Sequence, residues 1–261
     1  MSYFVWDVSP EILQIGSISI RWYGLLFALG FIIGYEITQW MFKIEKRNIK
    51  DIDKLTLIII LSTVIGARLG HCFFYEPQYY LANPVEILYV WKGGLASHGA
   101  AIAILLGIWY FVSRNKQYKF MWMIDRLVIT VAFAGSLIRL GNFFNSEILG
   151  IPSNVPWAII FANVDDIPRH AVQLYESVAY LLIFIYLLII YIRHKENLPS
   201  GRTFGVFLTL VFLARFILEF YKEQQTSLEA GLPLHMGQLL SIPFILTGLY
   251  FWIISHRVKS K

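Results

Sequence analysis

Seven long apolar stretches dominate the sequence and restrict what it can fold into. A helix that crosses a bilayer needs about 20 mostly apolar residues. Because lipid offers no hydrogen bonds, the backbone of such a stretch has to satisfy its own polar groups, which favours helices. The sequence therefore predicts an all-α polytopic membrane protein, with one integral membrane domain over 1–261 and about seven transmembrane helices. We place these helices at 18–42, 55–74, 93–112, 121–138, 171–192, 203–221 and 237–255.

The composition agrees with a protein surrounded by lipid. Hydrophobic residues make up 57% of the chain and charged residues only 15%, whereas charged residues form about 25% of an average soluble domain. The single cysteine, Cys72, excludes a disulfide scaffold. The start MSYFVWDVSPEI has no basic region and no cleavage site, so we expect no removable signal peptide.

Basic residues are concentrated on one side of the predicted helices. Of the 22 lysines and arginines, 14 lie in the segments 42–54, 113–120 and 193–202 and in the C-terminal tail. Short cytoplasmic loops carry such an excess. We therefore expect the N-terminus outside and the C-terminus inside. The net charge of +5 then reflects topology and not a nucleic-acid surface.

The predicted outer side has one long connection, 139–170, between the fourth and fifth helices. Its Gly, Pro and Asn residues indicate turns, and the run PWAIIFA is typical of a strand. Connections of this length are usually functional or disordered, and the aromatic and aliphatic content here argues against disorder. We expect a small ordered extracytoplasmic cap.

Polar side chains inside the predicted helices gather mostly in the outer half of the membrane. A charge at the bilayer centre costs about 2.5–3.5 kcal/mol on insertion scales, so such residues are functional candidates. Their one-sided distribution suggests a site near the outer interface. A purely structural role is the alternative interpretation for some of these residues. Arg215 and Glu219 could form an ion pair on one helix face, His98 could be a packed side chain, and Tyr23 could be an interfacial aromatic residue.

Arginine, amide and glycine residues crowd the exit of the fourth predicted helix. A guanidinium is a planar fork of donors that suits a phosphate, and glycines allow close approach to the backbone. A helix terminus capped by its own side chains is the alternative interpretation. The stretch RLGNFFNSEILG contributes Arg139, Gly141, Asn142, Asn145, Glu147 and Gly150.

The same stretch resembles the signature of the bacterial prolipoprotein diacylglyceryl transferases, Gly-Arg-x-Gly-Asn-Phe-x-Asn-x-Glu-x-x-Gly. Here it falls on 139–150, with Ile138 in place of the first glycine. The resemblance covers nearly the whole chain, although Lys222 begins a run that differs from the Arg-Glu-Pro-like run of the family. Five further blocks stand in family order: RWYG at 21–24, GGLASHG at 93–99, RHAVQLYE at 169–176, ARFILEFYK at 214–222 and MGQLLSIP at 236–243.

The resemblance implies a transfer reaction at the outer leaflet of the bacterial cytoplasmic (inner) membrane. The family moves the diacylglyceryl group of phosphatidylglycerol to the thiol of the lipobox cysteine of a prolipoprotein. The products are a thioether and glycerol 1-phosphate. We expect no metal, no organic cofactor and no nucleic-acid partner. Both substrates are embedded in the membrane, which suits a site near the interface.

The chemistry of this reaction suggests a role for each polar residue. The departing phosphate needs its charge stabilised, which suits Arg139 and Arg215. The attacking thiol has an ordinary pKa of about 8.5 and needs a base or a cationic environment. His98 is the first candidate base. We expect the catalytic residues to be Tyr23, His98, Arg139 and Arg215, and the substrate-binding residues to be Arg139, Asn142, Asn145, Glu147, Gly150, Glu219 and Gln238.

Two other classes of protein remain open. A small-anion transporter or channel would use the same arginines, but it would need polar residues through both halves of the membrane and usually an internal repeat. The sequence shows neither clearly. An intramembrane protease would need paired catalytic side chains or a metal site. The six histidines lie in different segments without H-E-x-x-H spacing.

Overall fold

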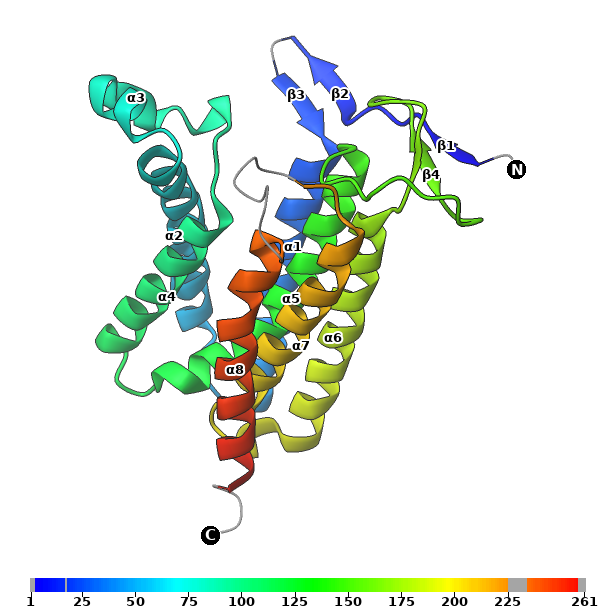
Figure 1. Cartoon of the computed structure of the whole chain (residues 1–261). Coiled ribbons are helices and arrows are strands. Elements are labelled where there is room, and N and C mark those ends of the chain that lie inside the picture. Colours follow the sequence, from blue (N-terminus) through cyan, green and yellow to red (C-terminus); the bar gives the residue numbers. More distant parts are fainter. Residues whose placement is uncertain (1–2, 17, 225–233, 258–261) are drawn as a thin grey trace. The chain divides into compact units, whose positions relative to one another are not determined.

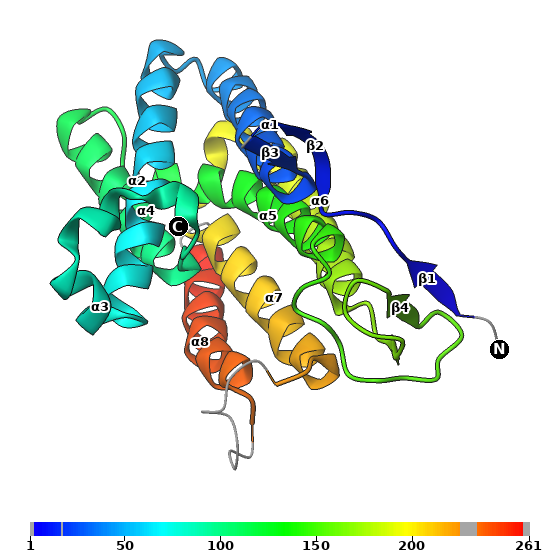
Figure 2. The same ribbon diagram turned by 90° about the horizontal axis from the view of Figure 1, so that it is seen from above.

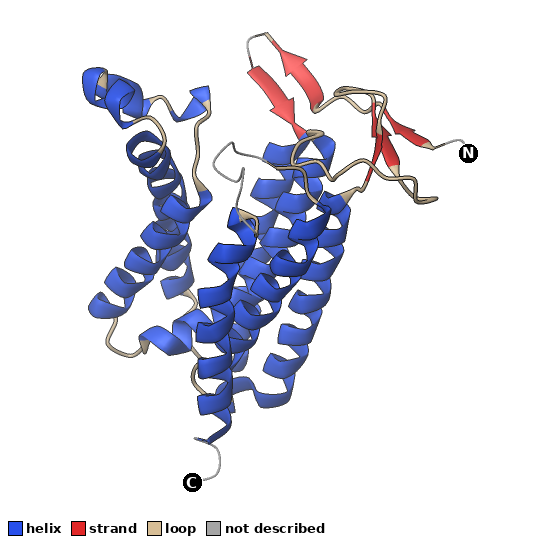
Figure 3. Ribbon diagram, viewed as in Figure 1, coloured by secondary structure: helices blue, strands red, loops and turns tan. Residues whose placement is uncertain are grey.

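Helices account for most of the computed structural model, which describes residues 3–16, 18–224 and 234–257 (Figures 1 and 3). Two basic residues of the tail, Lys259 and Lys261, lie outside the described residues. The long helices are α1 (Trp22–Ile44), α2 (Lys50–Phe74), α4 (Ser97–Arg114), α5 (Phe120–Phe144), α6 (Val172–His194), α7 (Arg202–Leu218) and α8 (Met236–Arg257). The short ones are α3 (Pro77–Ala82) and the 3₁₀ helices η1 (Pro84–Leu88), η2 (Val90–Lys92), η3 (Lys195–Asn197) and η4 (Glu219–Tyr221).

The prediction of a polytopic helical membrane protein is confirmed. Within the described residues, six helices are long and apolar enough to cross a membrane, and each corresponds to a predicted span. The remaining predicted span, the third (93–112), corresponds to α4, which has 18 residues. Large aliphatic side chains in mid-helix are exposed, among them Ile32 and Leu182, both at 61%. Apolar surface on this scale marks contact with lipid.

Two predicted helix starts are wrong. The first predicted span began at residue 18, but Ile18–Arg21 is a strand, because Ile and polar residues alternate there with period two. The third predicted span began at residue 93, but α4 begins at Ser97. Gly93 and Gly94 have φ values of 87° and 70°, a left-handed backbone that a helix cannot contain.

The chain divides into two compact units, which are described separately. The first contains Met1–Met41 and Asp125–Lys261, and so most of α1 and α5 with all of α6, α7 and α8. Helices α7 and α8 lie side by side (Figure 2). A Cβ atom at Gly205 would lie 2.5 Å from the Trp252 nitrogen, so these two backbones meet at a glycine.

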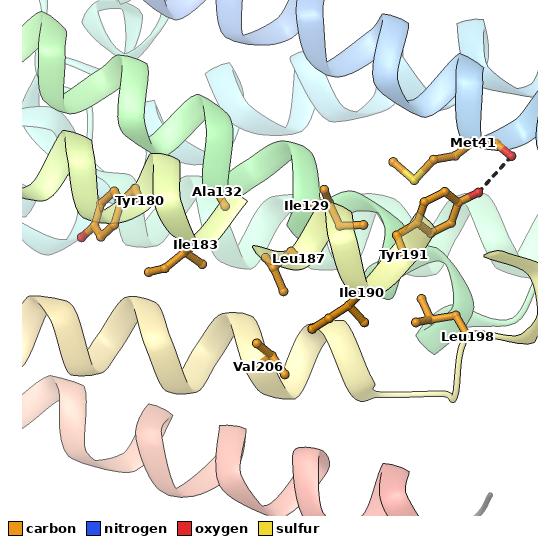
Figure 4. Packing of buried hydrophobic residues seen from close by; sticks show 10 residues of the cluster. All are labelled: Met41, Ile129, Ala132, Tyr180, Ile183, Leu187, Ile190, Tyr191, Leu198 and Val206. Carbon is orange, nitrogen blue, oxygen red and sulfur yellow. Dashed lines mark hydrogen bonds between the residues drawn. The ribbon is translucent and has the colours of Figure 1, made fainter. Parts of the chain in front are cut away.

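The core of this unit lies between α1, α5, α6 and α7. Met41, Leu187, Tyr191 and Val206 are fully buried, and the Tyr191 hydroxyl donates a hydrogen bond to the Met41 carbonyl oxygen at 3.3 Å (Figure 4). Near the same end, the Asp125 carboxylate accepts hydrogen bonds from backbone N–H groups at the start of α7, at Gly201 (2.6 Å) and Phe204 (3.0 Å). Asp125 is therefore a cap for α7 supplied by α5.

Two small sheets lie at the opposite end of this unit. The strand β1 (Phe4–Trp6) pairs in parallel with β4 (Ile159–Phe161), which pairs antiparallel with β5 (Pro168–Arg169). The strand predicted in PWAIIFA is thus present as β4. The helix before it, α5, continues to Phe144, inside the segment predicted as the cap. The second sheet is a hairpin of β2 (Glu11–Ile15) and β3 (Ile18–Arg21).

The second unit, Phe42–Ile124, is built on α2 and α4. These helices meet at glycines, because a Cβ at Gly99 would lie 2.3 Å from the Gly66 carbonyl oxygen. Arg68 of α2 is buried and donates to the carbonyl oxygens of Glu86, Ile87 and Gly93 at 2.6–3.0 Å. Arg68 therefore fixes the segment that leads into α4.

Candidate functional site

Arg139 lies near the end of α5 and makes contacts with two other polar groups. Its Nε lies 3.0 Å from Oε2 of Glu176, a fully buried residue on α6. Its Nη1 donates to the Asn142 Oδ1 atom at 3.2 Å, across one turn of the same helix. The ion pair and the amide hold the guanidinium at the point where α5 meets the cap segment.

An amide and carboxylate group lies at the end of α5 and in the loop that follows it. Asn142 and Asn145 both donate to Oε1 of Glu147, at 2.6 and 3.3 Å. Glu147 stands between Ser146 and Ile148, whose φ values of 51° and 57° lie in the left-handed region. Such a conformation is strained for a β-branched residue and occurs often at functional sites. The loop thus directs the carboxylate of Glu147 back toward the end of α5.

A second ion-pair network joins α6 to the end of α7. The Nζ atom of Lys222 lies 2.8 Å from Oε1 of Glu176 and 3.1 Å from Oε2 of Glu219. The side chains of Lys222 and Glu219 are only 4% and 9% exposed. Buried charges require such pairing, since an unpaired one is strongly destabilising. Glu176 is therefore shared between Arg139 and Lys222.

Glycines allow the parts of this site to approach one another. A Cβ at Gly150 would lie 2.2 Å from the His170 carbonyl oxygen, and one at Gly237 would lie 2.3 Å from Oε1 of Glu219. Gly150 also forms an isolated β-bridge with Lys222. Gln238, next to Gly237, is fully buried and donates to the Phe216 carbonyl oxygen at 3.2 Å.

Two tyrosines lie near Arg139. Tyr23 of α1 lies near Arg139 and Glu147, and Tyr180 of α6 forms a hydrogen bond with Arg139 and lies near Arg215. Gly141 makes room for Tyr23, since a Cβ there would lie 2.8 Å from its ring. Arg215 is half-buried on α7, and no carboxylate among the described residues pairs with it.

We name this group the Arg139 cluster. Nine of the ten predicted site residues belong to this cluster, and these nine lie in the first unit. Three further members were not predicted as site residues. The cluster consists of Tyr23, Arg139, Asn142, Asn145, Glu147, Gly150, Glu176, Tyr180, Arg215, Glu219, Lys222 and Gln238.

The tenth predicted residue, His98, lies in the second unit. It is the second residue of α4, and its exposed ring makes edge and tilted contacts with Phe74 and Tyr75, at centroid distances of 5.8 and 5.7 Å. The adjacent Gly99 packs tightly on Gly66. The place of His98 at the start of α4 is therefore well defined, and its role as a base stays a prediction.

The three unpredicted members are Glu176, Tyr180 and Lys222. Glu176 and Tyr180 lie on the outward-predicted part of α6, where the block RHAVQLYE is polar at the start of an otherwise apolar helix. This polar helix start is the sequence feature from which Glu176 and Tyr180 could have been predicted as site residues. Their pairing with groups on α5 and after α7 depends on tertiary contacts, which spacing along the chain does not reveal.

A separate ion-pair group holds the cap segment together. Arg169 lies 2.6 Å from Oδ2 of Asp165 and also pairs with Glu223. The hydrogen bond from Arg169 lowers the pKa of Asp165 below its usual range, and the same bond raises the pKa of Arg169. The cap is thereby tied to the chain that follows Lys222 in the cluster.

Comparison with known proteins gives consistent results over almost the full chain. The profile of the prolipoprotein diacylglyceryl transferase family matches residues 10–254. A phosphatidylglycerol–prolipoprotein diacylglyceryl transferase of Tolumonas auensis is 47% identical, over 98% of this chain and 99% of its own. Proteins of the same name are 49% identical in Chloroherpeton thalassium, over 99% and 96%, and 41% identical in Porphyromonas gingivalis, also over 99% and 96%.

Proposed function

Because the chain belongs to the prolipoprotein diacylglyceryl transferase family, we propose that the Arg139 cluster is its active site. The protein is a multi-pass membrane transferase that uses phosphatidylglycerol and prolipoproteins. The small-anion transporter is not favoured, because the relatives that match nearly the whole chain bear the name of the transferase.

The reaction exchanges one bond for another at a glyceryl carbon. The sulfur of the lipobox cysteine attacks the carbon of the diacylglyceryl group that carries the phosphate. A C–S bond forms as the C–O bond to the phosphate breaks, and glycerol 1-phosphate leaves with the bonding electron pair. The thiol proton passes to a base. Catalysis therefore requires stabilisation of a departing phosphate and activation of a thiol.

The charge distribution of the cluster supports the first requirement. Arg139 and Lys222 share the carboxylates of Glu176 and Glu219. Arg215 pairs with no described carboxylate, and it lies near Tyr180, which also forms a hydrogen bond with Arg139. A half-buried guanidinium without an acidic partner is suited to an anionic ligand. The observation that carries the proposal is Arg215, which has no acidic partner among the described residues and shares the neighbour Tyr180 with Arg139.

The remaining residues have supporting roles in the proposal. Asn142, Asn145 and Glu147 orient the lipid headgroup and Arg139, and Gly150 lets the ligand approach the backbone. Glu219 and Gln238 hold the end of α7 against the start of α8. Tyr23 assists at the reacting centre. His98 takes the proton of the thiol; its test is His98→Asn, which should lower the transfer rate and alter its pH profile.

We place the site toward the outer leaflet of the bacterial cytoplasmic membrane. The lipobox segment would then reach it from within the bilayer, since both substrates are held there. The basic residues of the loops 42–54, 113–120 and 193–202 support this orientation.

The proposal is tested with the full chain in vesicles of phosphatidylcholine and phosphatidylglycerol, supplied with a lipobox peptide. Mass spectrometry should show the peptide gaining the mass of a diacylglyceryl group. We expect Arg139→Ala and Arg215→Gln each to lower the rate at least 100-fold, since losing one stabilising donor costs about 10²–10³ in rate. Near-normal rates for both variants would reject the assignment of the Arg139 cluster, and peptide cleavage would instead indicate a protease.

A further inference from the structure

The hairpin of β2 and β3 has one aliphatic face and one polar face. In its register Leu13 stands opposite Ile20, and Ile15 stands opposite Ile18. Gln14 stands opposite Ser19. Because successive residues of a strand point to opposite faces, Leu13, Ile15 and Ile20 share one face, and Gln14 and Ser19 share the other.

The aliphatic face is uncovered. Leu13, Ile15 and Ile20 are 52%, 62% and 42% exposed. The register shifts between Glu11 and Leu13, so Glu11 pairs with Arg21 on the polar face, where the two exposed side chains form an ion pair at 3.2 Å. A two-stranded hairpin is marginally stable in water without a layer against its apolar side. Something outside the described chain is therefore needed to cover this face.

The position of the hairpin in the chain indicates what that covering is. Arg21, the last residue of β3, directly precedes Trp22, the first residue of the membrane-spanning α1. Figure 1 shows the hairpin extending from that end of the helix. A strand of five residues is about 17 Å long, so the whole hairpin stays near the membrane boundary. Trp is common at that boundary.

We propose that the aliphatic face of the β2–β3 hairpin lies in the lipid of the leaflet at the start of α1 and anchors that helix at a fixed depth. The polar face, with the Glu11–Arg21 pair, then lies toward the headgroups and water. This is the arrangement of an interfacial amphipathic element, realised by a hairpin.

The anchor has a consequence for the active site, and this part rests on the proposed function. Tyr23 follows Arg21 by two residues and packs against Gly141 of α5. A hairpin held in the leaflet fixes the first turn of α1, and with it the depth of Tyr23 relative to the lipid phosphates. The hairpin is thus a positioning element for Tyr23, which itself makes the contact with the cluster.

The test places spin labels on both faces of the hairpin. In a Cys72→Ala background, Leu13→Cys, Ile15→Cys and Ile20→Cys report the aliphatic face, and Gln14→Cys is the matched control on the polar face. Each full-length variant is labelled with a nitroxide in phosphatidylcholine–phosphatidylglycerol vesicles. Collision rates are measured with oxygen, which enters lipid, and with a water-soluble nickel chelate. We expect the oxygen-to-nickel ratio to be several-fold higher at 13, 15 and 20 than at 14.

Equal ratios at all four positions would overturn the proposal. A high ratio at 13, 15 and 20 that appears only after a lipobox peptide is added would also overturn it, and would assign this face to the peptide. Because these measurements need no turnover, they remain valid if the proposed reaction fails.

A functional arm tests the link to Tyr23. The double variant Leu13→Asn/Ile20→Asn should weaken the equilibrium between the membrane-anchored and the released hairpin by about one factor of ten. The kcat in vesicles should then fall on the order of ten-fold. Gln14→Ala should keep the wild-type rate. An unchanged kcat in the double variant, when a label at Ile15→Cys shows that this face has left the lipid, would reject the positioning role.

Discussion

At the residue scale, Glu176 connects two cations that come from different elements. Its two carboxylate oxygens lie 3.0 Å from Arg139 Nε and 2.8 Å from Lys222 Nζ. Its side chain is fully buried, so water cannot replace either contact. One carboxylate thus compensates charge from α5 and from the chain after α7.

We expect Glu176→Gln to impair both stability and transfer. The amide has nearly the same size but no charge, so Arg139 and Lys222 lose their shared counter-ion. Removing one partner of a buried ion pair costs on the order of 3 kcal/mol. Thermal unfolding in detergent and the initial rate of peptide lipidation measure the two effects.

Glu223→Gln is the matched control for this prediction. Glu223 also pairs with an arginine, Arg169, but its side chain is 45% exposed. The buried Arg169 keeps Asp165 as a partner when Glu223 is replaced, so we expect the loss of this partly exposed pair to cost only about 0–1 kcal/mol. Equal unfolding temperatures for the two variants would contradict the central place we give to Glu176.

Site residues could be predicted from the sequence where several of them lie close together along the chain. Arg139, Asn142 and Glu147 lie within nine positions, and the structure joins them by direct hydrogen bonds. Lys222 lies far from these residues in sequence and differs from the arginine of the family pattern. Its pairing with Glu176 could be found only from the packing of α6 against the end of α7.

At the element scale, glycines determine how α2 and α4 pack. A Cβ at Gly99 would meet the Gly66 carbonyl oxygen at 2.3 Å, and one at Gly66 would meet the Ala103 Cβ, also at 2.3 Å. Membrane helices use small residues in this way, because close backbone contact replaces the hydrophobic effect between them. His98 precedes Gly99, so this contact also sets its position.

We expect Gly99→Ala to destabilise the second unit. The added methyl group meets backbone atoms, which cannot rotate away as a side chain can, and overpacking of this kind costs about 1–3 kcal/mol. The measurement is thermal unfolding in detergent. Gly24→Ala is the control: nothing lies within 4 Å of a Cβ there, and the helix should gain about 0.5–1 kcal/mol. A destabilised Gly24→Ala with an unaffected Gly99→Ala would reject the packing argument.

The apolar helices were predictable because their length and hydropathy are local properties. The residues at which these helices begin were harder to predict. The prediction extended the first span over residues 18–21, because isoleucine suits both a strand and a membrane helix. The strand forms because β2 lies opposite, with Leu13 against Ile20. Strand pairing depends on a second segment of the chain, so the hydropathy of residues 18–21 alone could not predict it.

At the scale of the whole molecule, the predicted orientation assigns different surroundings to the two ends of the first unit. The cap and both sheets lie beyond the start of α6, and the connection containing η3 lies beyond its end (Figure 1). Three basic residues lie in or next to that connection: Arg193 at the end of α6, Lys195 in η3 and Arg202 at the start of α7. Basic residues close to helix ends are retained on the cytoplasmic side. The cap and the Arg139 cluster would then face outward.

Impermeant maleimide labelling of intact cells tests this orientation. In the Cys72→Ala background, we expect Asp166→Cys in the cap to react and Glu196→Cys in η3 to react only after the cells are opened. Both side chains are exposed, so access to the reagent is limited by the membrane alone. Reaction at position 196 but not 166 in intact cells would reverse the topology. The cluster would then open to the cytoplasm, where a prolipoprotein reaches it before export, so the result also decides at which stage of secretion the lipid is attached.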